Sequence, residues 1–257
     1  MTTLGDVLLD VVVRLEGTLV PGDDQPAVTS AGAGGQAANV AAWVAALGGE
    51  ARFVGRRGDD DAAELVTREL AAHGVAVSGP RGGRTGVVVS LASAGDRTMA
   101  SDRGAAPELR PDDLDPSWFD CDVLHVSGYS LMREPIASAS LAAAAHARAH
   151  GALVSVDVST WTLVDDAFRA RLRALAPDIA FATERERDAV AELATRWVVK
   201  RGARGLSVDG EEHEALETEV VDTTGAGDAL AAGFLLGGPT LGLEAAARCC
   251  ARMGAMP

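Results

Sequence analysis

One segment of the sequence places two glycines and an acid where a helix is expected to begin. Residues 220–228 read V-V-D-T-T-G-A-G-D and lead into an apolar stretch with helical character. The backbone N–H groups of Gly225, Ala226 and Gly227 could converge there on a phosphoryl group. Asp228 would lie in the first helical turn, where it could accept a proton from an attacking hydroxyl. Taken alone, the segment is equally compatible with turn glycines and an ordinary helix-start acid.

A second glycine-rich segment precedes another predicted helix. Residues 32–39 read G-A-G-G-Q-A-A-N. Gly34 and Gly35 would let a ligand approach the backbone closely, and Asn39 offers donors and acceptors to substrate hydroxyls. This segment is therefore a candidate binding site for a small hydroxylated molecule.

The same segment also matches part of a dinucleotide fingerprint, with Gly32-x-Gly34-x-x-Ala37. That fingerprint should follow a buried strand directly, whereas Thr29-Ser30-Ala31 comes before it here. A nucleotide-dependent oxidoreductase is therefore only the third-ranked function. The sequence contains no G-x-x-x-x-G-K-[ST], which excludes the P-loop class.

Predicted strands and helices alternate in the part of the chain that must position these segments. This rhythm indicates a parallel sheet with helices on both faces. The predicted strands are Val7–Val13, Ala51–Val54, Val123–Val126, Leu153–Val158, Ile179–Ala182, Trp197–Lys200, Gly205–Val208 and Val220–Val221. The predicted helices are Gly34–Leu47, Asp59–Ala72, Pro135–His150, Asp165–Leu175, Glu184–Ala194, Ala226–Leu236 and Glu244–Arg252.

Two segments, roughly 11–30 and 84–100, do not fit this rhythm. The second contains a predicted β-hairpin around Ala94-Gly95-Asp96. We expect both segments to form a small flap on a single domain that spans residues 1–257.

The composition limits the class of protein. A net charge of −14 argues against binding to nucleic acid or to anionic lipid. The chain has no run of eighteen apolar residues, and acids stand near its N-terminus where a signal peptide would be basic, so a cytoplasmic protein is expected. The three cysteines and five histidines have neither disulfide-framework nor metal-ligand spacing.

Lys200 is the only lysine in the chain, since arginine supplies the other 22 basic residues. A lysine that stands alone among arginines can serve as a compact point charge. It can also be a strand-end residue whose charged head lies in water.

The two glycine segments together resemble the signature motifs of the ribokinase (PfkB-type) carbohydrate kinase family. Gly34-Gly35 with Asn39 is similar to its G-G-x-x-x-N substrate motif, and Asp222–Asp228 to its D-T-x-G-A-G-D motif. The resemblance covers nearly the whole chain in order. Further similar segments are Gly5–Asp10, Gly58-Asp59-Asp60, Arg84-Thr85-Gly86, Gly104-Ala105-Ala106 and Val198–Gly205.

This resemblance implies a three-layer α/β/α sandwich with a mostly parallel central sheet and a small β-lid. It implies ATP-dependent phosphorylation of a sugar hydroxyl, with Asp228 as the base and the backbone of Gly225–Asp228 as the anion hole. Asp10, Gly34, Gly35 and Asn39 would orient the acceptor. The nucleotide would lie near Thr183, Lys200, Gly202, Gly205 and Thr223, with Mg²⁺ bridging its phosphates and Glu186 acting on the metal through water. The resemblance also allows a homodimer that forms through the lid.

The sequence departs from the family pattern at two places. Thr183 stands where the family usually has the asparagine of N-E-x-E, so weaker metal dependence or lower turnover is expected. Relatives often continue beyond residue 257 into a segment that completes a monovalent-cation site, so activation by potassium is not expected. Two alternatives to the sugar kinase stay open. The first is a nucleoside kinase of the same fold. The second, which these departures motivate, is a catalytically weak sugar- or nucleotide-binding protein that keeps the fold.

Overall fold

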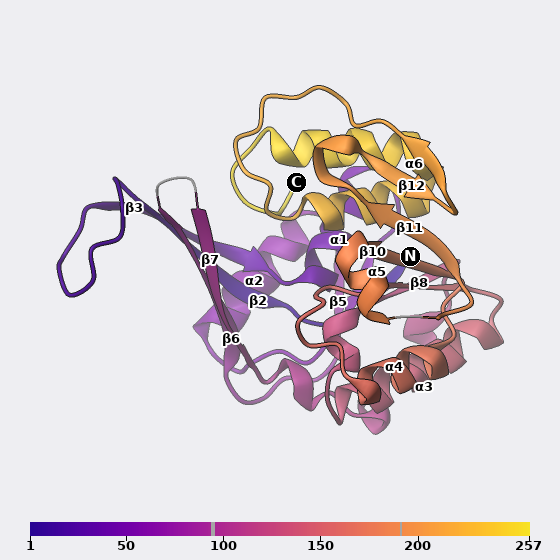
Figure 1. Ribbon diagram of the computed structural model, residues 1–257. Helices are drawn as coiled ribbons and strands as arrows, with labels where there is room; N and C mark the ends of the chain where they lie inside the picture. The colour runs from indigo at the N-terminus through magenta and orange to yellow at the C-terminus, as the bar shows by residue number, and fades with distance from the viewer. Residues whose placement is uncertain (94–95, 191) are drawn as a thin grey trace.

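The chain forms a large central sheet and a smaller second sheet (Figure 1). The computed structural model describes residues 1–93, 96–190 and 192–257. Within these residues the central sheet has the strand order β13-β12-β11-β10-β9-β8-β1-β4-β5. The seven neighbouring strands from β11 to β5 in this order pair in parallel, whereas β12 and β13 pair antiparallel at one edge. Its strands are β1 (Thr2–Leu4), β4 (Arg52–Val54), β5 (Ala76–Ser78), β8 (Val123–Ser127), β9 (Leu153–Asp157), β10 (Ile179–Thr183), β11 (Arg196–Lys200), β12 (Leu206–Val208) and β13 (Glu211–His213).

Helices cover both faces of the central sheet, because successive strand residues point to opposite sides and both sides are apolar. Leu124 and Val126 of β8 pack with α3 and α4, whereas Phe181 of β10 and Val198 of β11 pack with α1 and α6. The three-layer α/β/α prediction is confirmed. The helices are α1 (Gln36–Ala46), α2 (Asp61–Ala72), α3 (Ile136–Ala149), α4 (Asp166–Leu175), α5 (Glu184–Val190) and α6 (Ala226–Cys250).

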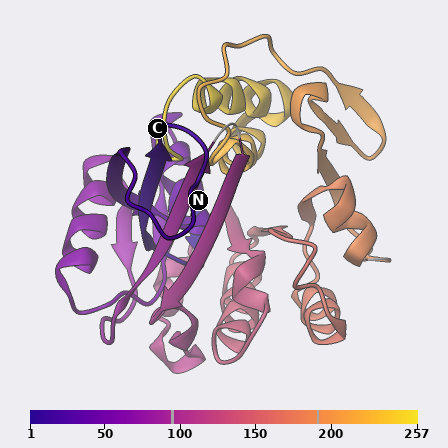
Figure 2. The same cartoon turned by 60° about the vertical axis from the view of Figure 1, so that its left-hand side comes forward.

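The second sheet projects from the body of the molecule (Figures 1 and 2). Its strand order is β3-β2-β6-β7, with β2 antiparallel to β3 and parallel to β6. The bounds are β2 (Leu8–Leu15), β3 (Ala27–Gly34), β6 (Thr85–Ser93) and β7 (Asp96–Gly104). It therefore joins the two segments that do not fit the βα rhythm, while residues 94–95 of the predicted hairpin turn lie outside the described residues.

One predicted strand is wrong, a second lies in another sheet, and one predicted helix is too long. Val7–Val13 belongs to the second sheet, and the central sheet instead begins with Thr2–Leu4, which lies between β4 and β8. Val220–Val221 is not a strand: both valines are exposed, and the Val221 N–H donates to the carbonyl of Cys250. The predicted helix Glu184–Ala194 ends at Val190 in the described chain.

The last helix, α6, contains a break that the sequence predicted. Gly237 and Gly238 have non-helical backbone angles and Pro239 follows them, which separates the two expected helices. By length and composition α6 could cross a membrane, and it is the one such helix among the described residues. Here it packs against α1 and β12, as a core helix does.

Candidate active site

The first turn of α6 opens at the carboxyl ends of the central strands. Gly225 precedes the helix with a φ of +77°, a left-handed angle that favours glycine. A Cβ on Gly225 would lie 2.5 Å from the Cβ of Ala255, so a side chain has no space there. The first N–H groups of a helix lack intrahelical partners. The N–H of Ala226 donates to the carbonyl of Thr223 at 3.3 Å. Among the hydrogen bonds of the described chain, those of Gly225, Gly227 and Asp228 have no such partner and are available to an anion.

Asp228 lies in this turn and is held by α1. Its Oδ2 accepts a hydrogen bond of 2.7 Å from Nδ2 of Asn39. The pKa of Asp228 is raised to about 7, mainly by burial. The charges of Asp157 and Asp10 also raise this pKa, whereas the hydrogen bond from Asn39 and the charge of Lys200 lower it. A carboxyl group that titrates near neutral pH can act as a general base.

The amide of Asn39 has a second polar atom beside the one bonded to Asp228. The residue is 5% exposed, and its Oδ1 is buried without a hydrogen-bond partner among the described residues. Because Asp228 accepts hydrogen bonds when ionised, the NH₂ group must face it and Oδ1 must face away. A buried acceptor of this kind is expected to receive a hydroxyl from a ligand.

The paired glycines allow β2 and β3 to approach α1. Gly35 has a φ of +99°, and a Cβ there would lie 2.5 Å from the carbonyl oxygen of Asp6. A Cβ on Gly34 would lie 2.0 Å from the carboxyl group of Asp10, which occupies that space. Burial raises the pKa of Asp10 to about 6. The structure thus brings Asp10, Gly34, Gly35, Asn39 and Asp228 together.

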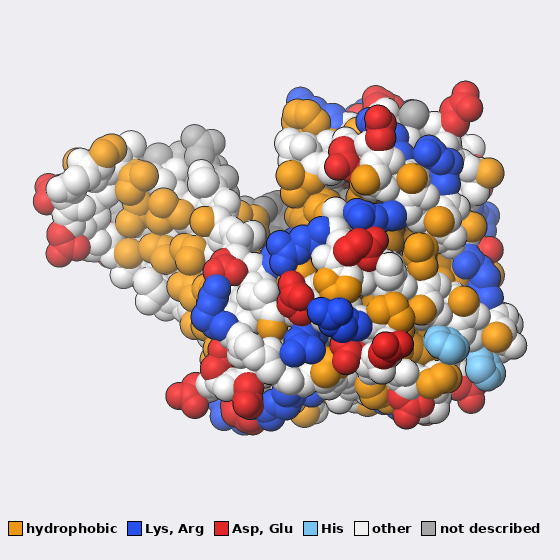
Figure 3. Space-filling view, turned by 90° about the horizontal axis from the view of Figure 1, so that it is seen from below, with side chains coloured by type: hydrophobic (Ala, Val, Ile, Leu, Met, Phe, Trp, Pro, Cys, Tyr) orange, Lys and Arg blue, Asp and Glu red, His pale blue; other side chains and the backbone are white. Residues whose placement is uncertain are grey.

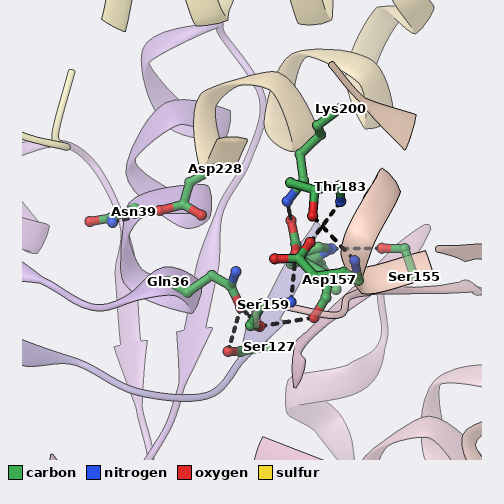
Figure 4. A network of polar contacts seen from close by, with 11 residues as sticks. Gln36, Asn39, Ser127, Ser155, Asp157, Ser159, Thr183, Lys200 and Asp228 are labelled. Atoms are coloured by element: carbon green, nitrogen blue, oxygen red, sulfur yellow. Dashed lines mark hydrogen bonds and ion pairs between the residues drawn. The ribbon is translucent and has the colours of Figure 1, made fainter. Parts of the chain in front are cut away.

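Lys200 enters the same region from the end of β11 (Figure 4). Its Nζ donates a 2.5 Å hydrogen bond to Oδ2 of Asp157, at the end of β9. The side chains are 15% and 1% exposed, respectively. The alternative in which the lysine head lies in water is therefore wrong.

Sequence reasoning missed a set of polar residues around this ion pair. The Asp157 Oδ1 accepts the N–H of Ser159, and Oε1 of Gln36 accepts the hydroxyls of both Ser127 and Ser159 at 2.6 Å (Figure 4). These contacts tie the ends of β8 and β9 to the start of α1. Their only sequence signal is that Ser127 and Asp157 lie within one residue of the ends of the predicted strands Val123–Val126 and Leu153–Val158, where ligand sites of α/β sheets form.

Thr183 and Glu186 form a compact turn at the end of β10. The Thr183 N–H donates to Oε2 of Glu186 at 2.7 Å, and the Glu186 N–H donates to the threonine hydroxyl at 3.4 Å. In the described chain no three His, Cys, Asp or Glu side chains gather as a metal cage. A single buried carboxylate fits Mg²⁺ held mainly by phosphate and water, which is the usual manner for nucleotide-bound magnesium.

The remaining predicted nucleotide residues lie further out. Gly202 has a φ of +59° in the exposed turn after β11, with open space around it. Gly205 is buried, and a Cβ there would lie 2.0 Å from the carbonyl oxygen of His213. Thr223 is exposed before the α6 turn. None of these three residues contacts Asp228 or Asn39 among the hydrogen bonds of the described chain.

A cavity of about 170 Å³ lies between the second sheet and residues near the C-terminus. Asp10, Ser30 and Ser90 line its sheet side, Glu69 reaches it from α2, and Thr224 borders it from the α6 turn. Of the described residues that line it, none is basic. The full lining is Asp10, Val12, Ser30, Ala31, Gly32, Ala33, Glu69, Val88, Ser90, Met99, Thr224, Met253, Gly254, Ala255 and Met256.

Known proteins share this fold and sequence. A solved adenosine kinase from Sinorhizobium meliloti matches with a TM-score of 0.84 and 28% identity over 100% of this chain and 95% of its own. A ribokinase from Thermotoga maritima shares the fold, with a TM-score of 0.79 and 21% identity over 100% of this chain and 95% of that one. The fructokinase of Escherichia coli is 31% identical over 94% of this chain and 85% of its own length.

The fold and these similarities define an enzyme of the carbohydrate kinase class, a phosphotransferase. The family model for pfkB family carbohydrate kinases matches residues 2–256. The chain belongs to the pfkB family of carbohydrate kinases.

The dinucleotide fingerprint lacks its expected context. Residues 32–34 end β3, an antiparallel strand of the second sheet, and do not follow a strand of the parallel sheet. The oxidoreductase alternative therefore has no support in the fold.

Proposed function

We propose that this enzyme transfers the γ-phosphate of ATP to a hydroxyl of a small, uncharged sugar, with Asp228 as the general base. The observation that carries this proposal is the position of Asp228 in the first turn of α6, hydrogen-bonded to the buried Asn39. A proton acceptor and a set of backbone donors then face the same point, which is the arrangement that phosphoryl transfer to a hydroxyl requires.

The residues divide the reaction between them. Asp10 and the Oδ1 of Asn39 receive hydrogen bonds from the acceptor, and Gly34-Gly35 lets it approach the backbone. The acceptor hydroxyl gives its proton to Asp228 while its oxygen forms a bond to the γ-phosphorus, and the bond from that phosphorus to the ADP oxygen breaks. The N–H groups of Gly225–Asp228 stabilise the charge on the transferring group.

The nucleotide would lie over the ends of β10 and β11. Lys200, Gly202 and Gly205 belong to the strand and turn there, and Thr183 and Thr223 stand on either side. When bound, Mg²⁺ neutralises part of the phosphate charge, and Glu186 is the residue that would hold it through water.

The cavity beside Asp10 favours a neutral sugar over a phosphorylated acceptor. Carboxylates of Asp10 and Glu69 line it without a basic side chain, so an acceptor that already carries a phosphate would be repelled. The similarity to an adenosine kinase keeps a nucleoside kinase as the second candidate. The third candidate is a catalytically weak binding protein, and the reason for keeping it is that Thr183 replaces the usual asparagine of the family.

We also propose that the second sheet acts as a lid and joins two copies of the chain. On the face opposite Asp10 its strands carry an apolar patch, and Figure 3 shows hydrophobic side chains over the projecting sheet. The patch consists of Leu9, Val11, Val13, Val87, Val89 and Leu91. Val89→Arg should shift a dimer to a monomer in sedimentation experiments; a wild-type monomer would contradict this proposal.

The test of function is ADP release from Mg·ATP with a panel of pentoses, hexoses, keto-sugars, sugar phosphates and nucleosides. Turnover should appear with an unphosphorylated sugar and disappear in Asp228→Asn. Turnover with nucleosides alone would establish the second candidate. Tight sugar binding without ADP release, at any concentration of ATP, would establish the non-catalytic alternative.

A further inference from the structure

The Lys200 side chain lies beside Gly227 in the first turn of α6. Its Cδ and Nζ lie 3.5 Å from the point where a Cβ on Gly227 would be. Gly227 is one of the residues whose N–H groups form the candidate anion hole. The ammonium and these N–H groups therefore present positive charge to the same small region.

Asp157 fixes the lysine in this position. It is 1% exposed, with one carboxylate oxygen on Lys200 and the other on the Ser159 N–H at 2.9 Å. A carboxylate held at both oxygens cannot rotate without breaking a buried hydrogen bond, which costs free energy. The location of the ammonium is therefore set by β9 as well as by its own strand.

The ion pair also keeps the lysine charged. Burial alone would lower the pKa of Lys200, but the charges of Asp157 and Glu186 and the hydrogen bond that Lys200 donates to Asp157 raise it overall. An ammonium has three N–H donors. The bond to Asp157 occupies one donor and leaves two that can reach an anion on the side of Gly227.

We propose that Asp157 is a positioning residue of the phosphoryl-transfer site, which holds Lys200 beside Gly227 so that its ammonium donates a hydrogen bond to the γ-phosphoryl group during transfer. This inference rests on the proposed kinase function. The lysine carries no proton away: the acceptor proton goes to Asp228, the new O–P bond forms, and the bond to ADP breaks while Lys200 stabilises the charge on the phosphoryl oxygens. In a protein of net charge −14, such a held cation offsets repulsion of the nucleotide.

The pair has a second consequence, because its two charges act on Asp228 in opposite directions. The groups that face Asp228 are Asn39 on α1, Asp10 on β2, Asp157 on β9 and Lys200 on β11. Tyr129, Glu186 and Cys249 interact with it or with Lys200 at longer range. Loss of the lysine charge should raise the pH at which Asp228 becomes a base, whereas loss of the Asp157 charge should lower it.

The first experiment compares Lys200→Met, Lys200→Arg and Asp157→Asn with the wild type, after circular dichroism and melting have shown that each variant folds. Lys200→Met should lower kcat on the order of 10²-fold and move the acid limb of kcat/KM to higher pH. Asp157→Asn should lower kcat less and move that limb to lower pH, and Lys200→Arg should recover part of the lost kcat. The proposal would be overturned if the acid limb of the kcat/KM profile stayed in place in Lys200→Met and Asp157→Asn, or moved in the same direction in both.

The second experiment does not need turnover, so it separates this inference from the proposed function. Lys200 is the only lysine, and an amine-directed reagent such as trinitrobenzenesulfonate can modify this residue and the N-terminal amine, which peptide mass spectrometry distinguishes. Mg·ATP should slow modification of Lys200 at least about tenfold and leave the N-terminus unaffected. In Asp157→Asn, Lys200 should react faster without nucleotide. Equal rates with and without Mg·ATP would contradict contact with the phosphates, even if the wild type is an active kinase.

Discussion

The acceptor side and the nucleotide side of the site are built differently. Around the acceptor, Asp228, Asn39 and Asp10 come from three packed elements and constrain one another through a hydrogen bond, buried charge and close backbone contact. On the nucleotide side, Gly202 and Thr223 lie on exposed turns, and the segment from 214 to 221 has no regular structure. In the proposed mechanism, proton transfer therefore uses closely packed side chains, whereas part of the proposed nucleotide site lies on exposed turns.

The largest effect should follow from replacing the base. Asp228→Asn removes the proton acceptor but keeps the side-chain shape, so kcat should fall on the order of 10³-fold. Binding of sugar and of Mg·ATP, measured by calorimetry, should change only a few-fold. Retained phosphotransfer in Asp228→Asn would contradict the assignment of Asp228 as the base.

Removal of the Asn39 amide should weaken the acceptor side in a pH-dependent manner. The hydrogen bond from Asn39 lowers the pKa of Asp228, so Asn39→Ala should move the acid limb of kcat/KM to higher pH. The acceptor KM should rise roughly tenfold, because one hydrogen bond to the sugar is lost. An unchanged limb with a raised KM would mean that Asn39 binds the sugar but does not tune the base.

A side chain at the start of α6 should disturb both sides at once. Gly225→Ala forces a left-handed residue to carry a Cβ against Ala255, which should cost about 1–3 kcal/mol of unfolding free energy. Gly202→Ala is the matched control, because its φ is also positive but no atom lies near the added Cβ. Urea denaturation should show a clearly larger loss for Gly225→Ala than for the control. Equal losses would mean that the contact with Ala255 contributes nothing.

The smallest effect on the kinetics is expected at Thr183, which stands where the family usually has an asparagine. Thr183→Asn adds an amide where Thr183 donates its N–H to Glu186. The KM for Mg·ATP should fall by a few-fold, with the sugar KM unchanged. Thr183→Val, which keeps the shape and removes the hydroxyl, should change Mg·ATP binding in the other direction. A large change in the sugar KM would contradict the separation of the two sides.

The parts of the fold and site that the sequence predicted are those with a local pattern. Asp228 and Asn39 follow glycine motifs at fixed spacing, and the break at Gly237-Gly238 is marked by Pro239. The strands Thr2–Leu4, Ala76–Ser78 and Glu211–His213 were missed because three residues show no periodicity and these strands exist through pairing with other strands. Val220–Val221 has β-branched residues but no partner strand, so its local preference was not decisive.

The polar network was missed for a related reason. Asp157 meets Lys200, 43 residues away, and Gln36 meets Ser159, 123 residues away. Asp157 is one of 37 acidic residues, and nothing in its neighbours distinguishes it. Only the order of the parallel strands brings the ends of β9 and β11 close enough to form this ion pair.

The most direct test of the central claim is the pH dependence of kcat/KM with the sugar that the panel identifies. A base that must be ionised, with the pKa of Asp228 at about 7, predicts that kcat/KM rises with pH through one ionisation near that value and is level above it. The small residual activity of Asp228→Asn should lack this rise. A profile that is flat from acid to neutral pH, or the same rise in the variant, would contradict the assignment of Asp228 as the base of this kinase.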